Sequence, residues 1–345
     1  MSTFSTIEQE IVEMFTTIIE EKDAYTAGHS KRVAMYSCKI AEAFNCSHAE
    51  QTLIYQAGLL HDIGKILTPE AILLKPRKFT RLEYAIIKNH STDGEKMLSF
   101  ISAFKRYMPI VRHHHERYDG TGYPDELAGE DIPFLSRILA VADAFDAMTT
   151  NRIYKPRKTI SNAAKELEKY SGTQFDPNIV AVASTVLLGF QEVSHLYQWP
   201  EDTVQEERFA HFYKDTITPA YTGEYLNYFL RSNREIERFK CCYVIQLHNM
   251  HQYNQQFGWT SGDSLLKEVA HRLKALFHTS YIFRIFGDDF VVLNPLHVKV
   301  DEEEIKYKIG VGFDSIQISI NHFALQELPI DKWETLEKHL IHHNS

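Results

Sequence analysis

The chain has 345 residues, 44% of them apolar, and these can fill the cores of two ordinary domains. Its formal net charge of −9 excludes a broad basic surface for a nucleic acid polymer, although a local basic pocket could still hold a small phosphate ligand. The four cysteines show no CxxC spacing and are typical of free thiols in a reducing compartment, so we expect a cytoplasmic location.

Residues 1–198 are predicted to form an all-α domain. The first residues lack the basic and apolar regions of a secretory signal. Apolar side chains then recur at steps of three and four residues, as in residues 7–18 and 33–40, and prolines separate the expected helices. The longest apolar run, residues 179–190, is shorter than the roughly 20 residues of a membrane helix, so we expect a core helix and no membrane span.

Residues 199–345 are predicted to form an α/β domain. We place the boundary in the polar, acidic segment over residues 196–214. Beyond it, apolar runs predict strands in CCYVIQL and IQISINHF, and helical spacing predicts an amphipathic helix in DSLLKEVAHRLKALF. The segment YIFRIFGDDFVVL predicts two strands that meet at Gly287 and Asp288. The expected fold class is therefore multidomain, with an all-α domain followed by an α/β domain.

The helical half contains a scattered set of side chains that can bind metal: His29, His61, Asp62, His90, His114, His115 and Asp143. Imidazole and carboxylate together suit Mn, Fe or Zn, and a carboxylate can bridge two ions. Each residue alone would be more typical of a surface or hydrogen-bonded side chain. However, His61 and Asp62 interrupt an apolar context, AGLL before and IGKI after, where polar groups need partners. Asp146 shares a helix side with Asp143, and we expect it to support the site.

The order and spacing of five motifs resemble the HD-GYP branch of the HD phosphohydrolase superfamily over about residues 20–190: YTAGHSKRV, GLLHDIGKI, IIKNHSTDGEKML, HHHERYDGTGYP and ILAVADAFDAMT. The resemblance implies two divalent metal ions, iron or manganese. It places one ion on His29, His61 and Asp143, the other on His90, His114 and His115, with Asp62 as the bridge. A third ion is not expected, because Tyr25 stands where some members of the family have a glutamate ligand. We interpret His113 as a solvent-facing or supporting residue.

The resemblance also implies residues that act around the metals. Lys65, one helical turn beyond His61, could stabilise the charge that develops on the scissile phosphate. Arg152 and Lys155 resemble positions that grip the phosphates of the ligand. The loop residues Gly122, Tyr123 and Pro124 are expected to border the substrate, and Asp119 to orient the loop or a ligand histidine.

The implied activity is hydrolysis of cyclic di-GMP to linear pGpG by a hydroxide held between the two ions, with Asp62 and Lys65 as catalytic residues. Further hydrolysis to GMP stays open. Two alternatives also stay open: a cyclic-dinucleotide receptor with weak catalysis, and a phosphodiesterase for a mixed cyclic dinucleotide. The complete ligand set favours the enzyme over the receptor.

The C-terminal half resembles a GGDEF domain, the diguanylate cyclase fold, in DTITPAYTGEYL and QQFGWTSGDSLL. Its signature turn reads Phe286-Gly287-Asp288-Asp289-Phe290, and Gln246 and His248 stand where cyclases carry metal-binding aspartates. The inhibitory RxxD motif is replaced by FHTS. We therefore expect a degenerate, regulatory domain. It could bind GTP or another nucleotide, or it could only pack and pair in a homodimer, and the sequence leaves both open.

Overall fold

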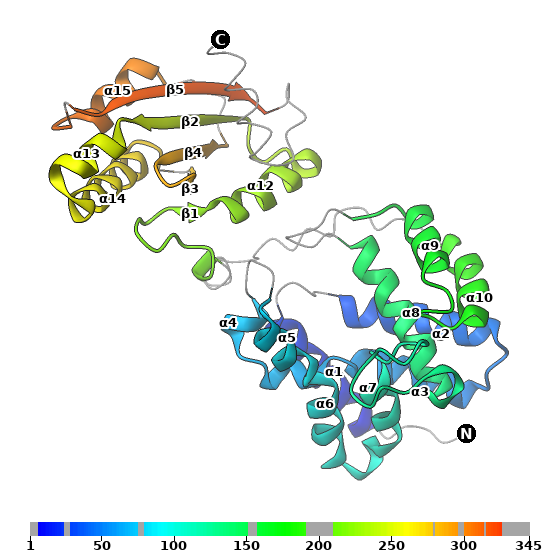
Figure 1. The fold of residues 1–345 in the computed structure, drawn as a ribbon. Helices are drawn as coiled ribbons and strands as arrows, with labels where there is room; N and C mark the ends of the chain where they lie inside the picture. Colours follow the sequence, from blue (N-terminus) through cyan, green and yellow to red (C-terminus); the bar gives the residue numbers. More distant parts are fainter. Residues whose placement is uncertain are drawn as a thin grey trace. The chain divides into compact units, whose positions relative to one another are not determined.

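The computed structural model describes residues 6–23, 28–74, 79–150, 157–190, 210–278, 280–295, 300–313 and 315–325. The chain divides into two compact units, Met1–Trp199 and Pro200–Ser345 (Figure 1). The predicted boundary at residue 198 lies among residues 191–209, outside the described parts. Within the described parts, no helix has the length and apolar character needed to cross a bilayer.

The N-terminal unit is all-α, as predicted. It consists of the α-helices α1 (Thr6–Lys22), α2 (His29–Ala43), α3 (His48–Leu60), α4 (Glu70–Leu73), α5 (Arg81–Lys88), α6 (His90–Ser99), α7 (Met108–His113), α8 (Phe134–Thr149), α9 (Ile160–Lys169) and α10 (Pro177–Leu188), and of the short 3₁₀ helices η1 (Ile63–Leu67), η2 (Ser102–Tyr107) and η3 (Gly129–Asp131). Capping boxes start two of these helices: Ser47 with Glu50 at α3, and Thr80 with Glu83 at α5.

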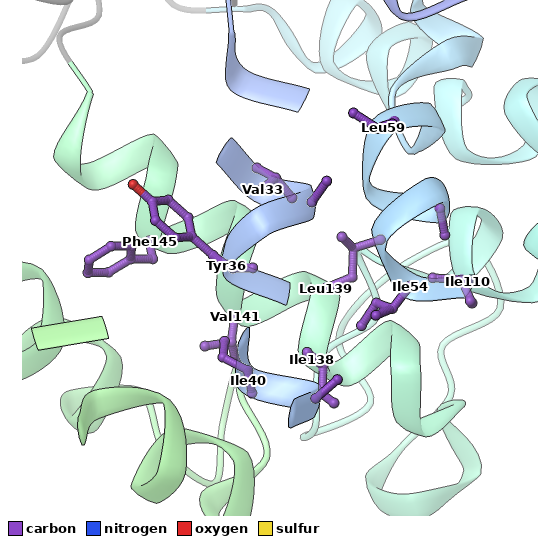
Figure 2. Packing of buried hydrophobic residues seen from close by; sticks show 14 of the residues in the cluster. Val33, Tyr36, Ile40, Ile54, Leu59, Ile110, Ile138, Leu139, Val141 and Phe145 are labelled. Carbon is purple, nitrogen blue, oxygen red and sulfur yellow. The ribbon is translucent and has the colours of Figure 1, made fainter. Parts of the chain in front are cut away.

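The core of this unit forms where α2, α3, α7 and α8 meet (Figure 2). Its buried side chains include Val33, Tyr36, Ile40, Ile54, Ile110, Ile138, Leu139, Val141 and Phe145. The rings of Tyr36 and Phe145 pack edge to face with centroids 5.3 Å apart. Burial of each such aliphatic or aromatic side chain contributes roughly 1.5–3 kcal/mol. This core fixes the helices that carry the metal-competent residues.

A second close contact joins η1 to α6. A Cβ atom added to Gly64 would lie 1.9 Å from the carbonyl oxygen of His90 and 2.6 Å from the amide nitrogen of Gly94. Only glycine therefore allows this approach of the two backbones. The contact brings the chain just after Asp62 against the first turn of α6.

The C-terminal unit is α/β, as predicted. Its strands are β1 (Tyr221–Thr222), β2 (Cys241–His248), β3 (Tyr281–Ile285), β4 (Asp289–Asn294) and β5 (Gln317–Ala324), and its described helices are α12 (Gly223–Ile236), α13 (Met250–Phe257), α14 (Trp259–Leu276) and α15 (Glu302–Gly310). The sheet order is β1-β3-β4-β2-β5. Among the described strands, β1 and β3 pair in parallel, and the other pairs are antiparallel.

Strand β2 is almost entirely buried between β4 and β5, which explains its near-continuous apolar sequence. The amphipathic helix α14 packs Leu265, Val269 and Leu273 into the same core as Tyr243 and Ile245 of β2. The strands β3 and β4 are joined by a turn at residues 286–288, at the predicted position. Phe286 and Gly287 in this turn have positive φ angles of 48° and 89°.

Candidate metal centre

The helix ends of the N-terminal unit bring the seven metal-competent side chains together. His29 begins α2, His61 follows α3, His90 begins α6 and His114 follows α7, while Asp143 lies within α8. Their ligand atoms form three groups in which all atoms lie within 4.8 Å of one another: His29 with His61 and Asp143, His90 with His114 and His115, and His61 with Asp62 and His114. The first two are the groups that the resemblance implies.

Asp62 lies between the two groups. Its Oδ2 atom is 3.3 Å from His61 Nε2 and 3.8 Å from His29 Nε2. Its Oδ1 atom is 3.5 Å from His90 Nε2 in the other group. The residue is 3% exposed. The two oxygens of one buried carboxylate thus face different groups, an arrangement that suits a ligand shared by two cations.

The Nδ1 atoms of three histidines are held by the backbone. His61 Nδ1 lies 2.7 Å from the carbonyl of Gly58, and the Nδ1 atoms of His90 and His114 lie 2.6 Å from the carbonyls of residues 87 and 111. A carbonyl oxygen only accepts hydrogen bonds, so each Nδ1 must carry the proton and donate. In the neutral ring, Nε2 then keeps its lone pair and points into the centre.

The Nε2 atoms lack protein donors that would satisfy them. Among the described residues, buried His61 Nε2 has no hydrogen-bond partner. His90 Nε2 and His114 Nε2 face each other at 3.3 Å, although the hydrogen bonds at Nδ1 leave both as acceptors. Two facing lone pairs are unfavourable unless a cation lies between or beside them. The donor set therefore fits divalent metal.

Burial and mutual repulsion keep the second histidine group neutral. Burial, followed by the field of His90, lowers the pKa of His115 to about 3. Burial likewise lowers the pKa of His90 and, more strongly, the pKa of His114. Neutral imidazole is the form that binds metal, so this group is ready to bind without losing protons near neutral pH.

Asp62 and Asp143, in contrast, are held in their charged form. Burial disfavours the charge on Asp62 and is the largest single effect, but the positive field of Lys65 and the neighbouring histidines together outweigh it and hold the pKa of Asp62 well below its usual range. Burial also opposes the charge on Asp143 and is the largest single effect, but the hydrogen bond with His29 and the fields of the neighbouring histidines together reverse it and lower the Asp143 pKa. Both carboxylates are therefore ionised over the working pH range.

Asp146 and Arg32 orient His29 from behind. Asp146 Oδ2 lies 2.7 Å from His29 Nδ1, while Asp143 Oδ1 lies 3.3 Å from the opposite nitrogen, Nε2. The Asp146 carboxylate also accepts two hydrogen bonds from Arg32, at 2.6 and 3.0 Å. Such a carboxylate–histidine pair fixes the ring and its tautomer. Arg32 was not predicted from the sequence as a site residue, although it lies one helical turn beyond His29 in HSKRV.

Lys65 lies at the edge of the same centre. Its Nζ atom is 2.9 Å from Asp62 Oδ2 and 3.0 Å from Asp23 Oδ2. Burial opposes its charge, but the two carboxylates outweigh this and raise the Lys65 pKa. The lysine is thus a fixed positive charge beside the metal-competent residues. Asp23 was also missed, and its buried position at the end of α1 gave no signal in the sequence.

The loop over residues 119–125 borders the centre through Tyr123. The Tyr123 ring packs on the His115 ring with centroids 4.9 Å apart and an angle of 32°. Gly122 is required for this placement, because an added Cβ would lie 2.3 Å from the amide nitrogen of Arg117. Asp119 organises the start of the loop: it accepts hydrogen bonds from the backbone and side chain of Thr121, at 3.0 and 2.6 Å.

The residue after Pro124 anchors the other end of this loop. Asp125 accepts two hydrogen bonds from Arg112, at 2.6 and 2.7 Å, and its Oδ2 lies 2.9 Å from His113 Nε2. Its backbone N–H donates to Glu116 Oε1 at 2.7 Å. His113 therefore holds the loop and does not join either histidine group. Three further positions named above, Tyr25, Arg152 and Lys155, lie outside the described residues.

Comparison with known families identifies one domain in each of the two units. Residues 13–179 match the family model of the HD domain, and residues 215–328 match that of the GGDEF domain, diguanylate cyclase. The chain contains an HD domain followed by a GGDEF domain. Phosphohydrolases with HD domains bind divalent metals, and the histidine and aspartate groups of this HD domain fit that chemistry.

Curated relatives match the chain over the HD domain. A cyclic di-GMP phosphodiesterase of Thermotoga maritima is 38% identical over 195 residues, which cover 56% of this chain and 52% of the relative. A 3'3'-cGAMP-specific phosphodiesterase of Vibrio cholerae is 38% identical and covers 51% and 38%. A cyclic di-GMP phosphodiesterase response regulator of Xanthomonas campestris is 40% identical and covers 50% and 46%. The chain thus spans about half or less of the length of these relatives.

Proposed function

We propose that the HD domain is a metal-dependent phosphodiesterase that hydrolyses cyclic di-GMP to linear pGpG. The single observation that carries this proposal is the position of Asp62, with Oδ2 toward His61 and Oδ1 toward His90. It supports a centre of two ions that share one carboxylate. The names of the relatives, which are phosphodiesterases for cyclic di-GMP or 3'3'-cGAMP, support the substrate class.

In this proposal His29, His61 and Asp143 hold one ion, while His90, His114 and His115 hold the other. Iron and manganese suit such mixed imidazole and carboxylate ligands. When bound, two divalent ions would neutralise the phosphodiester and activate water for attack in line with the leaving oxygen. The protein's own contribution is orientation: Asp146 and the backbone carbonyls fix the imidazoles, so little reorganisation is needed.

Lys65 supplies a charge that is already in place. Its ammonium is held by Asp23 and Asp62, so it does not have to be ordered when the substrate binds. A phosphodiester beside Asp62 would come within reach of this ammonium. The negative charge that grows on the phosphate oxygens in the transition state would then be stabilised. We propose Lys65 as a catalytic residue on this ground, and Arg152 and Lys155 as phosphate-binding residues on the resemblance alone.

A mixed cyclic dinucleotide is the second candidate substrate. The observation that favours it is the presence of a 3'3'-cGAMP-specific phosphodiesterase among relatives of equal identity. A receptor without catalysis has less support, because all seven metal-competent residues are retained and brought together.

We propose that the GGDEF domain is degenerate and regulatory, and that it either binds GTP or another nucleotide or only packs and pairs in a homodimer. Gln246 Nε2 lies 3.5 Å from Asp289 Oδ2, so an amide stands beside the carboxylate where a metal-binding pair would be expected. His248 Nε2 is engaged with Ser319 Oγ at 2.8 Å. These contacts support a domain that does not carry out cyclase chemistry.

The four cysteines are free, which supports the expected cytoplasmic location.

Product analysis tests the proposed activity. The full chain, reconstituted anaerobically with iron or manganese, is incubated separately with cyclic di-GMP and 3'3'-cGAMP, and products are resolved by chromatography. We expect pGpG from cyclic di-GMP. Faster turnover of 3'3'-cGAMP would select the mixed substrate. Binding of either dinucleotide without any hydrolysis would overturn the enzyme and favour the receptor.

A further inference from the structure

A lysine at the end of α5 lies between two tyrosine rings beside the metal centre. Lys88 Nζ is 5.1 Å from the ring centroid of Tyr84 and 4.8 Å from that of Tyr123. The two tyrosines come from different segments, α5 and the loop over residues 119–125. An ammonium over two aromatic faces is held by cation–π attraction, which restricts a side chain that is otherwise flexible.

This lysine is one side chain away from a metal-competent histidine. The Tyr123 ring that carries the ammonium packs on the His115 ring, with 4.9 Å between centroids. The Tyr123 ring therefore lies between His115 of the metal centre and the positive charge of Lys88.

No carboxylate of the described residues neutralises the charge of Lys88. Among the residues that the structure describes, Lys88 forms contacts with the two rings but no ion pair. The side chain is half-buried, and Tyr84 beside it is 49% exposed. The three N–H donors of the ammonium are not satisfied by the π faces. Lys88 is thus an oriented cation at the border of the proposed phosphodiesterase centre. An anionic group of the substrate could form an ion pair with it.

The separation of Lys88 from the histidines decides which anion fits. A phosphodiester bound among His90, His114 and His115 would be separated from the ammonium by the Tyr123 ring. A cyclic dinucleotide carries a second phosphodiester on the opposite side of its ring, and in this proposal that group is the anion on the far side of Tyr123. The compact charge of a lysine ammonium suits one phosphate oxygen without demanding a fixed bidentate geometry.

We propose that Lys88, held by Tyr84 and Tyr123, binds the second, non-scissile phosphodiester of a cyclic dinucleotide. This inference rests on the proposed function and adds a specificity residue to it. Lys88 distinguishes substrates with two phosphodiesters from substrates with one. Tyr123 then has two roles. It packs on His115, and it positions the ammonium that binds the non-scissile phosphodiester.

The test compares two substrates in the metal-loaded full chain: cyclic di-GMP and bis(p-nitrophenyl) phosphate, which has a single phosphodiester. Lys88→Met removes the charge but keeps an unbranched side chain over the rings. Lys88→Arg keeps the charge. Lys96→Met, an exposed position on α6, is the matched control. Metal content and melting temperature are measured for every variant, so that loss of the fold or of the centre is detected.

We expect Lys88→Met to raise the KM for cyclic di-GMP about tenfold or more, with kcat within about twofold and no change for bis(p-nitrophenyl) phosphate. Lys88→Arg should restore most of the affinity, and Lys96→Met should behave as wild type. An unchanged KM for cyclic di-GMP overturns the role of Lys88. Equal losses on both substrates, or loss of metal, also overturn it and leave a structural role. A wild-type protein that hydrolyses only the single phosphodiester overturns the proposed function itself.

Discussion

Lys65 Nζ lies 3.0 Å from Asp23 Oδ2, and this contact ties the end of α1 to the metal centre. Asp23 is 4% exposed, so the pair is shielded from solvent and from salt. The same ammonium contacts Asp62 at 2.9 Å. We infer that Asp23 keeps Lys65 in place when metal ions compete with the lysine for Asp62.

Replacement of Asp23 tests this positioning role. Asp23→Asn should lower kcat for cyclic di-GMP by about tenfold, because the lysine loses its second anchor, while the metal content stays at the wild-type level. Asp23→Glu should recover part of the activity because it restores the charge. Steady-state kinetics and metal analysis of the three proteins decide the matter, and a wild-type kcat in Asp23→Asn would refute the role.

The anchor at Asp125 gives a second prediction. Asp125→Ala removes the hydrogen bonds from Arg112 and the contact with His113, and so releases the loop that carries Tyr123. Because the pair is near the surface, the melting temperature should change little. The kcat/KM for cyclic di-GMP should nevertheless fall by about tenfold, since Tyr123 no longer packs in a fixed position on His115. A loss of activity that only follows a loss of stability would argue against this anchor.

The glycine between η1 and α6 gives a third prediction. Gly64→Ala places a methyl group where the His90 carbonyl now lies, so η1 and α6 must separate. We expect destabilisation of about 1–3 kcal/mol and weaker binding of the ion held by His90. Chemical denaturation and metal titration measure the two effects. Gly189→Ala, where the nearest atom is 3.3 Å from the added carbon, is the milder control, and an equally small effect at Gly64 would contradict the close packing.

The GGDEF domain should respond to acid through Asp215. Burial opposes the charge of this carboxyl, but hydrogen bonds from the backbone of Thr218 and from Arg284 outweigh it and lower the Asp215 pKa. The stabilisation is therefore fully present above the ordinary carboxyl pKa, and it is lost as the pH falls through the lower folded-state value. Asp215→Asn should reduce stability by about 1–2 kcal/mol at neutral pH and by less in acid. A destabilisation that does not depend on pH would contradict this account.

The sequence predicted the helical and α/β halves because each has its own apolar period, as in α2 and β2. It also predicted the clustering of His61, Asp62 and Asp143, because motifs of this spacing resemble one family. The supporting contacts could not be predicted in the same way. Asp23 and Lys65 are 42 positions apart, and their pairing depends on how α1 packs beside η1.

The loop around Tyr123 shows the same limit. Its glycines and tyrosine indicated a turn near a ligand, but the stacking of Tyr123 on His115 and the position of Lys88 depend on the approach of α5 to this loop. The lysine itself gave no signal, since a single lysine at the end of a helix is typical of a solvated position. Long-range packing, which the local pattern does not encode, decided its role.

We propose above that Asp62 would be shared by two metal ions on which hydrolysis depends. The most direct measurement is metal stoichiometry with turnover of cyclic di-GMP for the wild type, Asp62→Ala and His115→Ala. We expect two ions per chain in the wild type, loss of at least one ion in each variant, and a fall in kcat of more than about a thousandfold in both. Full turnover with one ion or none, or undiminished activity in Asp62→Ala, would contradict the account.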